Sequence, residues 1–389
     1  MNFENTQIAF AYKNDAELKN AYMLYKMIGN NFLVKTGGAL AKTAVNVRFP
    51  IGWAVKPTIY KLFVGGETME SCNSIIENFA KHNVKIVLDY SVEGGKTDAQ
   101  IQHALDETLR TIDNAANNSN IPYAVFKPTA FGLPEILEKA GEGKSLNEIE
   151  QKEAEKFEIR VKQLCQRAYE KNVPIMIDAE DYAYQNYVDD VVYKMMLLYN
   201  KEKAIVFNTL QMYRKDRLEF LHQLYEQAQK DNIYVGIKFV RGAYMERERA
   251  RAARLGYEDP IHPNKQATDD AYNAALKFSI EHIDRISIFN ATHNEYSCQY
   301  MAKLMQENNI VKTDKRCYFS QLYGMSDNIT FNLAQEGYNV AKYTPYGPIK
   351  HVLPYLIRRT EENTSVAGQT PRQLELLKKE IDRRKSLKK

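Results

Sequence analysis

The stretch AIVFNTLQMYRKDRLEFLHQLYEQAQKDNIYVGIKFV, residues 204–240, decides the fold class. It begins with an apolar run at 204–210, continues with a helical pattern at 216–230 and ends with a second apolar run at 234–240. Continuous apolar runs rich in β-branched residues are typical of strands buried in a parallel sheet. The stretch therefore predicts a strand, a crossover helix and a second parallel strand.

The same unit recurs along most of the chain. Because eight such units in roughly 300 residues are typical of a (β/α)8 barrel, we predict an α/β fold of the TIM-barrel type. A doubly wound open sheet is the alternative, but the chain has no strand–GxGxxG–helix unit. The eight predicted strands are VKIVLDY (84–90), YAVFKPT (123–129), VPIMIDAE (173–180), AIVFNTL (204–210), YVGIKFV (234–240), ISIFNAT (286–292), CYFSQLYG (317–324) and NVAKYTPYG (339–347).

Two further parts of the chain surround these units. We predict a helical N-terminal extension over residues 1–66, followed by the barrel over residues 67–389. The charged stretch at 141–160 is expected to be an exposed helical insertion before the third strand, and the basic tail is expected to be an amphipathic helix.

The composition is that of a packed globular protein. The chain has 389 residues, is 44% hydrophobic and carries a net charge of +4, which is too mild and too dispersed to indicate a nucleic-acid partner. Its four cysteines form no CxxC pair, so they are interpreted as reduced core thiols. They are Cys72, Cys165, Cys298 and Cys317.

The first residues resemble neither a secretory signal nor a mitochondrial presequence, and no apolar window is long enough to span a membrane. We therefore expect a cytoplasmic protein. Peripheral contact with the inner face of the cytoplasmic membrane is an open alternative, because residues 28–66 and the tail are basic with apolar residues between.

Three familiar motifs are excluded. The stretch GEGKS at 141–145 lacks the first glycine and the preceding strand of a phosphate-binding loop. The seven histidines show no metal-ligand spacing, so no metal is predicted, and no GxSxG elbow occurs.

Polar residues stand at the carboxyl ends of most predicted strands, where barrel enzymes build their active sites. Burying so many polar groups without a function is unfavourable, so these residues are candidates for a site. Asp178 and Glu180 are two apart on one strand and are expected to point the same way. The set comprises Asp89, Lys127, Asp178, Glu180, Gln211, Lys238, Arg241, Thr292, His293 and Tyr343.

Two adjacent arginines near the end of the chain are a second candidate. In HVLPYLIRRTEEN, helical spacing places Tyr355, Arg358, Arg359 and Glu362 on one face beside apolar residues. Two neighbouring guanidiniums suit a small carboxylate, whereas a solvated basic patch is the ordinary alternative. In KFVRGAY (238–244), the small residues would let the backbone approach a flat or anionic ligand, although a glycine in a turn is also common.

Taken together, the chain from about residue 84 to 366 resembles proline dehydrogenase, a flavin-dependent (β/α)8 barrel family. The form KFVRGAYMERERARA is most similar to the mitochondrial-type branch. The matching motifs are DYSVEG (89–94), FKPTAFG (126–132), MIDAED (176–181), NTLQMY (208–213), KFVRGAYMERERARA (238–252), ATHN (291–294), YGMSD (323–327) and KYTPYGP through YLIRRTEEN (342–363).

The resemblance implies non-covalently bound FAD and oxidation of L-proline to Δ1-pyrroline-5-carboxylate. A hydride would pass from the ring carbon next to nitrogen to flavin N5, and a quinone would take up the electrons. Catalytic roles are implied for Asp178, Lys238 and Tyr244. The implied substrate-binding residues are Lys127, Tyr343, Tyr355, Arg358 and Arg359, with the three cations around the proline carboxylate.

The cofactor-binding set implied by the resemblance is Gln211, Lys238, Val240, Arg241, Gly242, Ala243, Thr292, His293 and Glu362, of which Glu362 would also pair near the arginine face. Asp89 and Glu93 resemble an outer gate. Lys238 departs from the arginine of many bacterial members and loses the planar fork, which affects the expected rate. Tyr343 is retained, which favours proline over hydroxyproline, although a hydroxyproline dehydrogenase of the same family is the alternative.

Two rival functions stay open. One is a barrel enzyme that uses Lys127 or Lys238 as a Schiff-base nucleophile. The other is a membrane-surface or interaction protein without flavin. If proline is the substrate, pyrroline-5-carboxylate dehydrogenase is expected to be a separate protein partner.

Overall fold

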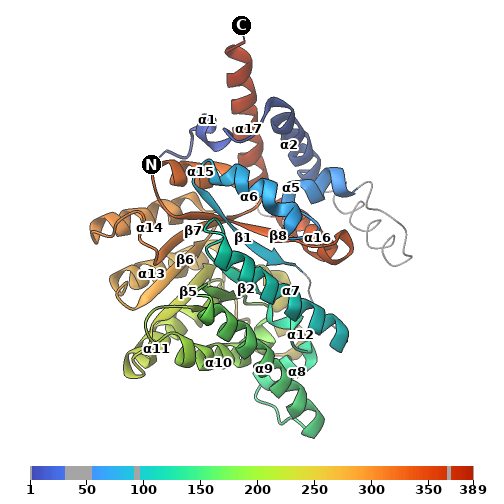
Figure 1. The fold of residues 1–389 in the computed structure, drawn as a ribbon, viewed down its shortest axis with the longest axis vertical. Helices are drawn as coiled ribbons and strands as arrows, with labels where there is room; N and C mark the ends of the chain where they lie inside the picture. Colours follow the sequence, from blue (N-terminus) through green and yellow to red (C-terminus); the bar gives the residue numbers. More distant parts are fainter. Residues whose placement is uncertain (1, 31–54, 92–96, 366–368, 389) are drawn as a thin grey trace. The chain divides into compact units, whose positions relative to one another are not determined.

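The computed structural model describes residues 2–30, 55–91, 97–365 and 369–388, and omits the side chains of 360–365 and 369 (Figure 1). The chain forms two compact units. The first unit comprises Met1–Ser91 with Gln321–Lys389, and the second comprises Val92–Ser320. The expected boundary at residue 66 stays a prediction.

Eight strands form one sheet in the order β1-β8-β7-β6-β5-β4-β3-β2. The recorded pairings are parallel, so the predicted (β/α)8 class is confirmed. Each strand lies within a run predicted from the sequence, apart from a one-residue extension of β4. The strands are β1 (Val84–Tyr90), β2 (Ala124–Phe126), β3 (Ile175–Ile177), β4 (Val206–Gln211), β5 (Val235–Val240), β6 (Ile286–Ala291), β7 (Cys317–Leu322) and β8 (Val340–Tyr346).

Burial explains why these runs form strands. All six residues of β4 and all seven of β8 are buried, as expected where both faces of a parallel strand are covered. In the second unit, Thr209 of β4 pairs with Lys238 of β5, and Ile177 of β3 pairs with Asn208 of β4. This register brings the carboxyl ends of β3, β4 and β5 to one edge.

Helices follow the strands of the second unit, and their polar first turns mark their starts. Asn147 and Glu150 form a reciprocal capping box at α9, and the side chain of Asn294 accepts from Ser297 N at α14. The helices are α7 (Asp98–Asn117), η3 (Pro128–Ala130), α8 (Pro134–Gly141), α9 (Glu148–Glu170), α10 (Tyr182–Tyr199), α11 (Arg217–Lys230), α12 (Met245–Leu255), α13 (Lys265–Glu281) and α14 (Glu295–Glu307).

The prediction of an exposed insertion at 141–160 was wrong in part. A helix does cover most of the stretch, but α9 runs on to Glu170 and buries Ala154, Phe157 and Val161. It is therefore the connecting helix between β2 and β3. In the sequence of α9, the many charged residues of its exposed face obscure the apolar residues that lie along its buried face.

The first unit joins both ends of the chain in one core. Phe10 and Tyr25 lie in the same apolar cluster as Val352, Leu356 and Leu377. Its helices are α1 (Thr6–Ala9), α2 (Asp15–Ile28), η1 (Lys56–Tyr60), α5 (Lys61–Phe63), η2 (Glu70–Cys72), α6 (Asn73–Ala80), α15 (Asp327–Gln335), α16 (Ile349–Ser365) and α17 (Gln369–Ser386).

Two general expectations can be compared with this fold. All four cysteines are buried, and burial raises the pKa of Cys72 to about 12, so they are core thiols. Across the described helices, none combines the length and apolarity needed to cross a membrane.

Candidate active site

A carboxylate between two ammonium groups lies at the strand ends of the second unit. Lys238 Nζ donates to Asp178 Oδ1 at 2.6 Å, and Lys127 Nζ lies 3.6 Å from Asp178 Oδ2. The three side chains are 6–12% exposed, so water screens them little. The cluster carries a net positive charge, which suits an anionic or electron-rich ligand.

Backbone geometry places these three groups. Lys238 belongs to β5, and Asp178 follows β3 with its N–H donating to Phe126 O at 2.9 Å. Lys127 follows β2 and caps the short helix η3. The sequence predicted that these residues would meet, because the carboxyl ends of parallel strands share one edge.

Glu180 supports the turn that carries Lys127. Thr129 N and Thr129 Oγ1 donate to its two carboxylate oxygens at 2.9 and 2.8 Å. Glu180 is 5% exposed, so both hydrogen bonds are buried and charge-assisted. The prediction placed Asp178 and Glu180 on one strand, but β3 ends at Ile177. Both side chains nevertheless contact the segment 127–129, Asp178 through Lys127 and Glu180 through Thr129. Sequence reasoning nevertheless assigned Glu180 no role, because its partner lies 51 residues away.

The segment Val240–Tyr244 leaves β5 in a turn held by Arg241. Arg241 donates to Asp269 Oδ1 at 2.7 Å, Thr292 Oγ1 at 2.6 Å and Ser297 Oγ at 3.0 Å. Its guanidinium also lies 4.3 Å from the ring centroid of Tyr272. Burial raises the pKa of Asp269, but Lys265 and Arg241 outweigh burial and hold that pKa below its ordinary value.

Gly242 allows the backbone to pass over an aromatic ring. Its φ is +125°, and an added Cβ would lie 2.6 Å from the Tyr213 ring. Both features favour glycine. Tyr213 was not singled out from the sequence, although it follows β4 in the same motif as Gln211. Burial raises the pKa of Tyr213 well above its usual range.

Gln211 is the last residue of β4, and Thr292 directly follows β6. Gln211 is 2% exposed, and its Oε1 has no hydrogen-bond partner within the part of the chain that the structure describes. Thr292 Oγ1 accepts from Arg241 and from Asn294 N. His293 lies between Thr292 and Asn294 in the chain. An unsatisfied buried acceptor, a cationic cluster and a glycine turn without a side chain together fit a flat polar ligand.

The remaining predicted residues belong to the first unit. Arg358 and Arg359 are half-buried on α16, and the Arg359 guanidinium lies 5.6 Å from the ring centroid of Tyr355. Their apolar neighbours Val352 and Leu356 are fully buried, in agreement with the predicted helical face. The arginines therefore hold charge beside an apolar surface.

Tyr343 and Asp89 lie on β8 and β1. Tyr343 is 7% exposed and its carbonyl accepts from Tyr323 N at 2.8 Å. Asp89 is 1% exposed and accepts from Ser91 Oγ. The side chain of Glu362 and the whole of Glu93 lie outside the described residues. The gate and the shared carboxylate clamp stay predictions.

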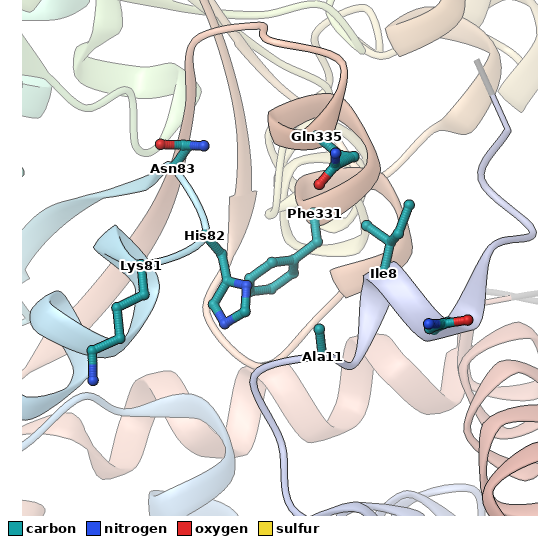
Figure 2. A pocket seen from close by; sticks show the side chains of 8 residues that line it. Ile8, Ala11, Lys81, His82, Asn83, Phe331 and Gln335 are labelled. Atoms are coloured by element: carbon teal, nitrogen blue, oxygen red, sulfur yellow. The ribbon is translucent and has the colours of Figure 1, made fainter. Parts of the chain in front are cut away.

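A separate cleft of about 220 Å³ lies in the first unit (Figure 2). Lys81, His82 and Asn83 line one side of it, and Ile8 and Ala11 line the other, with Phe331 between. None of the predicted site residues lines it. Among the described residues, no group of three or more His, Cys, Asp or Glu side chains is placed to hold a metal ion.

Comparison with known proteins identifies relatives over most of the chain. A family model described as "Proline dehydrogenase" matches residues 72–372. The chain is 37% identical over 326 residues to the carbapenem antibiotics biosynthesis protein CarD of Pectobacterium carotovorum subsp. carotovorum, with 84% of each chain covered. It is 34% identical over 373 residues to the mitochondrial proline dehydrogenase 2 of Arabidopsis thaliana, covering 85% of this chain and 78% of that one.

Solved structures with the same fold include proline utilization A (PutA) from Bdellovibrio bacteriovorus inactivated by N-propargylglycine. The TM-score is 0.73 at 22% identity, over 92% of this chain and 38% of that one. The chain thus spans well under half the length of this PutA protein.

Proposed function

The chain belongs to the proline dehydrogenase family, and on that premise we propose that it oxidises L-proline to Δ1-pyrroline-5-carboxylate with FAD as cofactor and a quinone as electron acceptor. The observation that carries the proposal is the family match over residues 72–372, which includes every strand of the barrel. The buried cationic cluster at the strand ends supports it.

The strand ends of the second unit are proposed to hold the cofactor. Gln211 offers a buried amide and Lys238 offers an ammonium. The segment Val240, Arg241, Gly242 and Ala243 offers backbone groups, and Gly242 and Ala243 leave room beside them. Thr292 and His293, and Glu362 of the first unit, complete the proposed set. When bound, FAD supplies the oxidising power of the reaction, since it accepts a hydride from the substrate and passes the electrons on.

Lys127, Arg358 and Arg359 are proposed to bind the carboxylate of proline, because guanidinium forks match its two oxygens. Tyr343 and Tyr355 are proposed to pack against the ring. Fixing both the carboxylate and the ring leaves the substrate little freedom to turn, which is how binding groups raise the rate of a positioned reaction.

The cations also favour the reactive protonation state. The amine lone pair of proline must be free before the neighbouring carbon can release a hydride. Nearby positive charge lowers the pKa of an ammonium group, so Lys127, Lys238 and the arginines favour the neutral amine. Asp178 neutralises part of this charge and, through its 2.6 Å hydrogen bond, fixes the position of the Lys238 ammonium.

Hydroxyproline oxidation is the second candidate within the family. Tyr343 argues against it, because a bulky phenol at this position would leave little room for a ring hydroxyl. We expect kcat/KM to be clearly higher for L-proline than for 4-hydroxy-L-proline. The reverse preference would favour the alternative.

Arg358→Met tests the carboxylate clamp. Losing a charge-assisted hydrogen bond costs roughly 1.5–3 kcal/mol, so KM for L-proline should rise about tenfold to a hundredfold while FAD stays bound. Lys350→Met, an exposed change on the same helix, is the matched control. An unchanged KM in both Arg358→Met and Arg359→Met would show that the arginines do not bind the substrate.

The Schiff-base rival makes a different prediction. A lysine nucleophile would leave the purified protein colourless, and borohydride would trap a covalent adduct with a carbonyl substrate. The proposed flavoenzyme is yellow and loses its visible absorption on addition of proline. A colourless protein that cannot be loaded with FAD would rule out the proposed function.

A further inference from the structure

Lys342 is a fully buried lysine inside a barrel strand. It is 0% exposed on β8, next to Tyr343 in the sequence. Burying an ammonium is unfavourable unless its donors are satisfied. Its Nζ lies 2.9 Å from Asp327 Oδ1, 3.4 Å from Leu322 O and within hydrogen-bond distance of Met325 O. These partners all belong to the segment Leu322–Asp327 between β7 and α15, so Lys342 fastens this turn to β8.

The turn contains two residues in a backbone conformation that is unfavourable unless neighbouring groups hold it. Gly324 and Ser326 have φ of +79° and +50°, in the left-handed region that most side chains disfavour. A Cβ at Gly324 would lie 2.0 Å from Leu62 O, so the N-terminal segment packs directly on the turn.

The N-terminal segment contacts the turn at two further points, once from the connection between α1 and α2 and once from α2. Tyr12 OH donates to Asp327 Oδ2 at 2.7 Å, and Lys13 Nζ lies 3.9 Å from the same oxygen. Tyr25 OH donates to Gly324 O. Tyr12 also stacks on Phe331 of α15, with centroids 4.6 Å apart and an interplanar angle of 12°. Asp327 therefore joins the N-terminal segment, α15 and β8 within one unit.

The turn in addition sets the backbone of Tyr343. Tyr323 N, near the start of the segment, donates to Tyr343 O at 2.8 Å. Successive side chains of a strand point to opposite faces. Since Lys342 points to the turn, Tyr343 points to the other face of β8. A shift of the turn would therefore move Tyr343 as well.

Charge is an unusual means of holding such a turn. Replacing a buried ion pair by apolar groups is often neutral or stabilising, so stability alone does not explain the pair. Burial raises the pKa of Asp327, yet Lys342 and Lys13 outweigh burial and keep that pKa below its ordinary value. The Lys342–Asp327 ion pair thus fixes the direction in which the turn lies against β8.

We propose that the Lys342–Asp327 ion pair, completed by Tyr12, is a positioning device that holds Tyr343 in the orientation required for proline binding. Lys342, Asp327 and Tyr12 are thus positioning residues, and the N-terminal helix region takes part in substrate affinity. This inference rests on the proposed function, because Tyr343 is there assigned to the proline ring.

Tyr12→Phe and Lys342→Met in the flavin-loaded full chain test the proposal, with exposed Lys350→Met as control. Loss of the constraint should raise KM for L-proline about fivefold to tenfold in each, with kcat changed by less than about twofold. Amide hydrogen exchange of residues 322–327 should become faster in both variants, and in the control neither quantity should change. Tyr12→Phe removes one hydroxyl, so it tests the proposal even if Lys342→Met fails to fold.

Faster exchange with unchanged KM would overturn the proposal, because the network would then be structural only. The double variant Lys342→Met/Asp327→Asn removes both charges, and a wild-type KM in it would equally contradict a positioning role. A wild-type protein that does not oxidise proline would overturn the proposed function instead. The exchange rates would then decide separately whether the ion pair holds the turn.

Discussion

Asp178 is the residue on which the charge balance of the second unit depends. It is the recorded counterion of both Lys238 and Lys127, and all three side chains are nearly buried. Removing one partner of a buried ion pair is far costlier than removing an exposed pair, because the remaining charges stay in a medium of low dielectric constant.

Asp178→Asn keeps the shape and removes this counterion. Two buried ammonium groups would then repel each other, and we expect a loss of roughly 3–5 kcal/mol in the free energy of unfolding. Chemical denaturation measures this loss. Asp190→Asn, an exposed change on α10, should cost less than about 0.5 kcal/mol, as is usual for surface positions. Equal stability of the two variants would show that Asp178 is not a buried counterion.

The sequence predicted which polar residues stand at the strand ends, but not how they pair. Lys127, Asp178 and Lys238 were identified because parallel strands bring their carboxyl ends together. Which carboxylate binds which ammonium depends on the positions in space of residues far apart in the sequence. Asp178 and Lys238, for example, are 60 residues apart. Glu180 was noticed for its spacing but received no role for the same reason.

At the scale of elements, the turn after β5 requires glycine at position 242 for two separate reasons, its backbone conformation and the lack of space for a side chain. Gly242 has a positive φ and no room for a Cβ against the Tyr213 ring. Gly256, after α12, has a φ of +73° but no atom within 4 Å of where its Cβ would be. Comparing Gly242 with Gly256 therefore distinguishes the effect of a left-handed backbone from the effect of a close contact at Cβ.

Gly242→Ala should therefore be much more harmful than Gly256→Ala. We expect roughly 1–2 kcal/mol of destabilisation at Gly256 from the left-handed backbone alone, and more at Gly242, together with weaker FAD retention. Thermal unfolding and the flavin content of the purified variants measure both effects. If the two variants behave alike, the contact with Tyr213 contributes nothing.

The connection between β4 and α11 should respond to acid. Burial raises the pKa of Asp216, but hydrogen bonds from Arg217 and Arg214 outweigh burial and lower it to about 2. Because the folded pKa lies below the ordinary value of 3.8, ionised Asp216 stabilises the fold above that value. This contribution is lost as the pH falls from 3.8 through about 2.

Asp216→Asn should consequently lower the thermal midpoint at neutral pH and flatten its decline between those two pH values. Asp284→Asn, at an exposed site, is the control and should change neither. A decline as steep in Asp216→Asn as in the wild type would contradict the assigned ion pairs. The Asp216 side chain is 46% exposed, so solvent screening reduces the contribution of its ion pairs to stability.

Elements differed in how well the sequence predicted them. The positions of all eight strands were predicted, because burial on both faces leaves an uninterrupted apolar run. The predicted runs at 123–129 and 173–180 were too long, since β2 and β3 have three residues each. Helix α9 was mistaken for an insertion, since its buried residues Ala154, Phe157 and Val161 are widely spaced among charges.

At the scale of the whole molecule, the alternation of strand and helix was sufficient to predict the (β/α)8 class, because few folds repeat that unit eight times. The joining of the two chain ends in one unit was not predictable in the same way. Arg384 donates to Phe10 O across 374 residues, and no local pattern signals such a contact. Tertiary contacts of this kind leave no periodic trace in sequence.

The central claim is that this chain oxidises L-proline by two electrons, which leave the substrate as a hydride together with the loss of one proton. The most direct test is anaerobic titration of the FAD-loaded protein with L-proline, followed by identification of the product by mass spectrometry. We predict that the flavin absorption bleaches and that one Δ1-pyrroline-5-carboxylate forms per flavin reduced. A flavin that stays oxidised in the presence of excess L-proline would contradict the account.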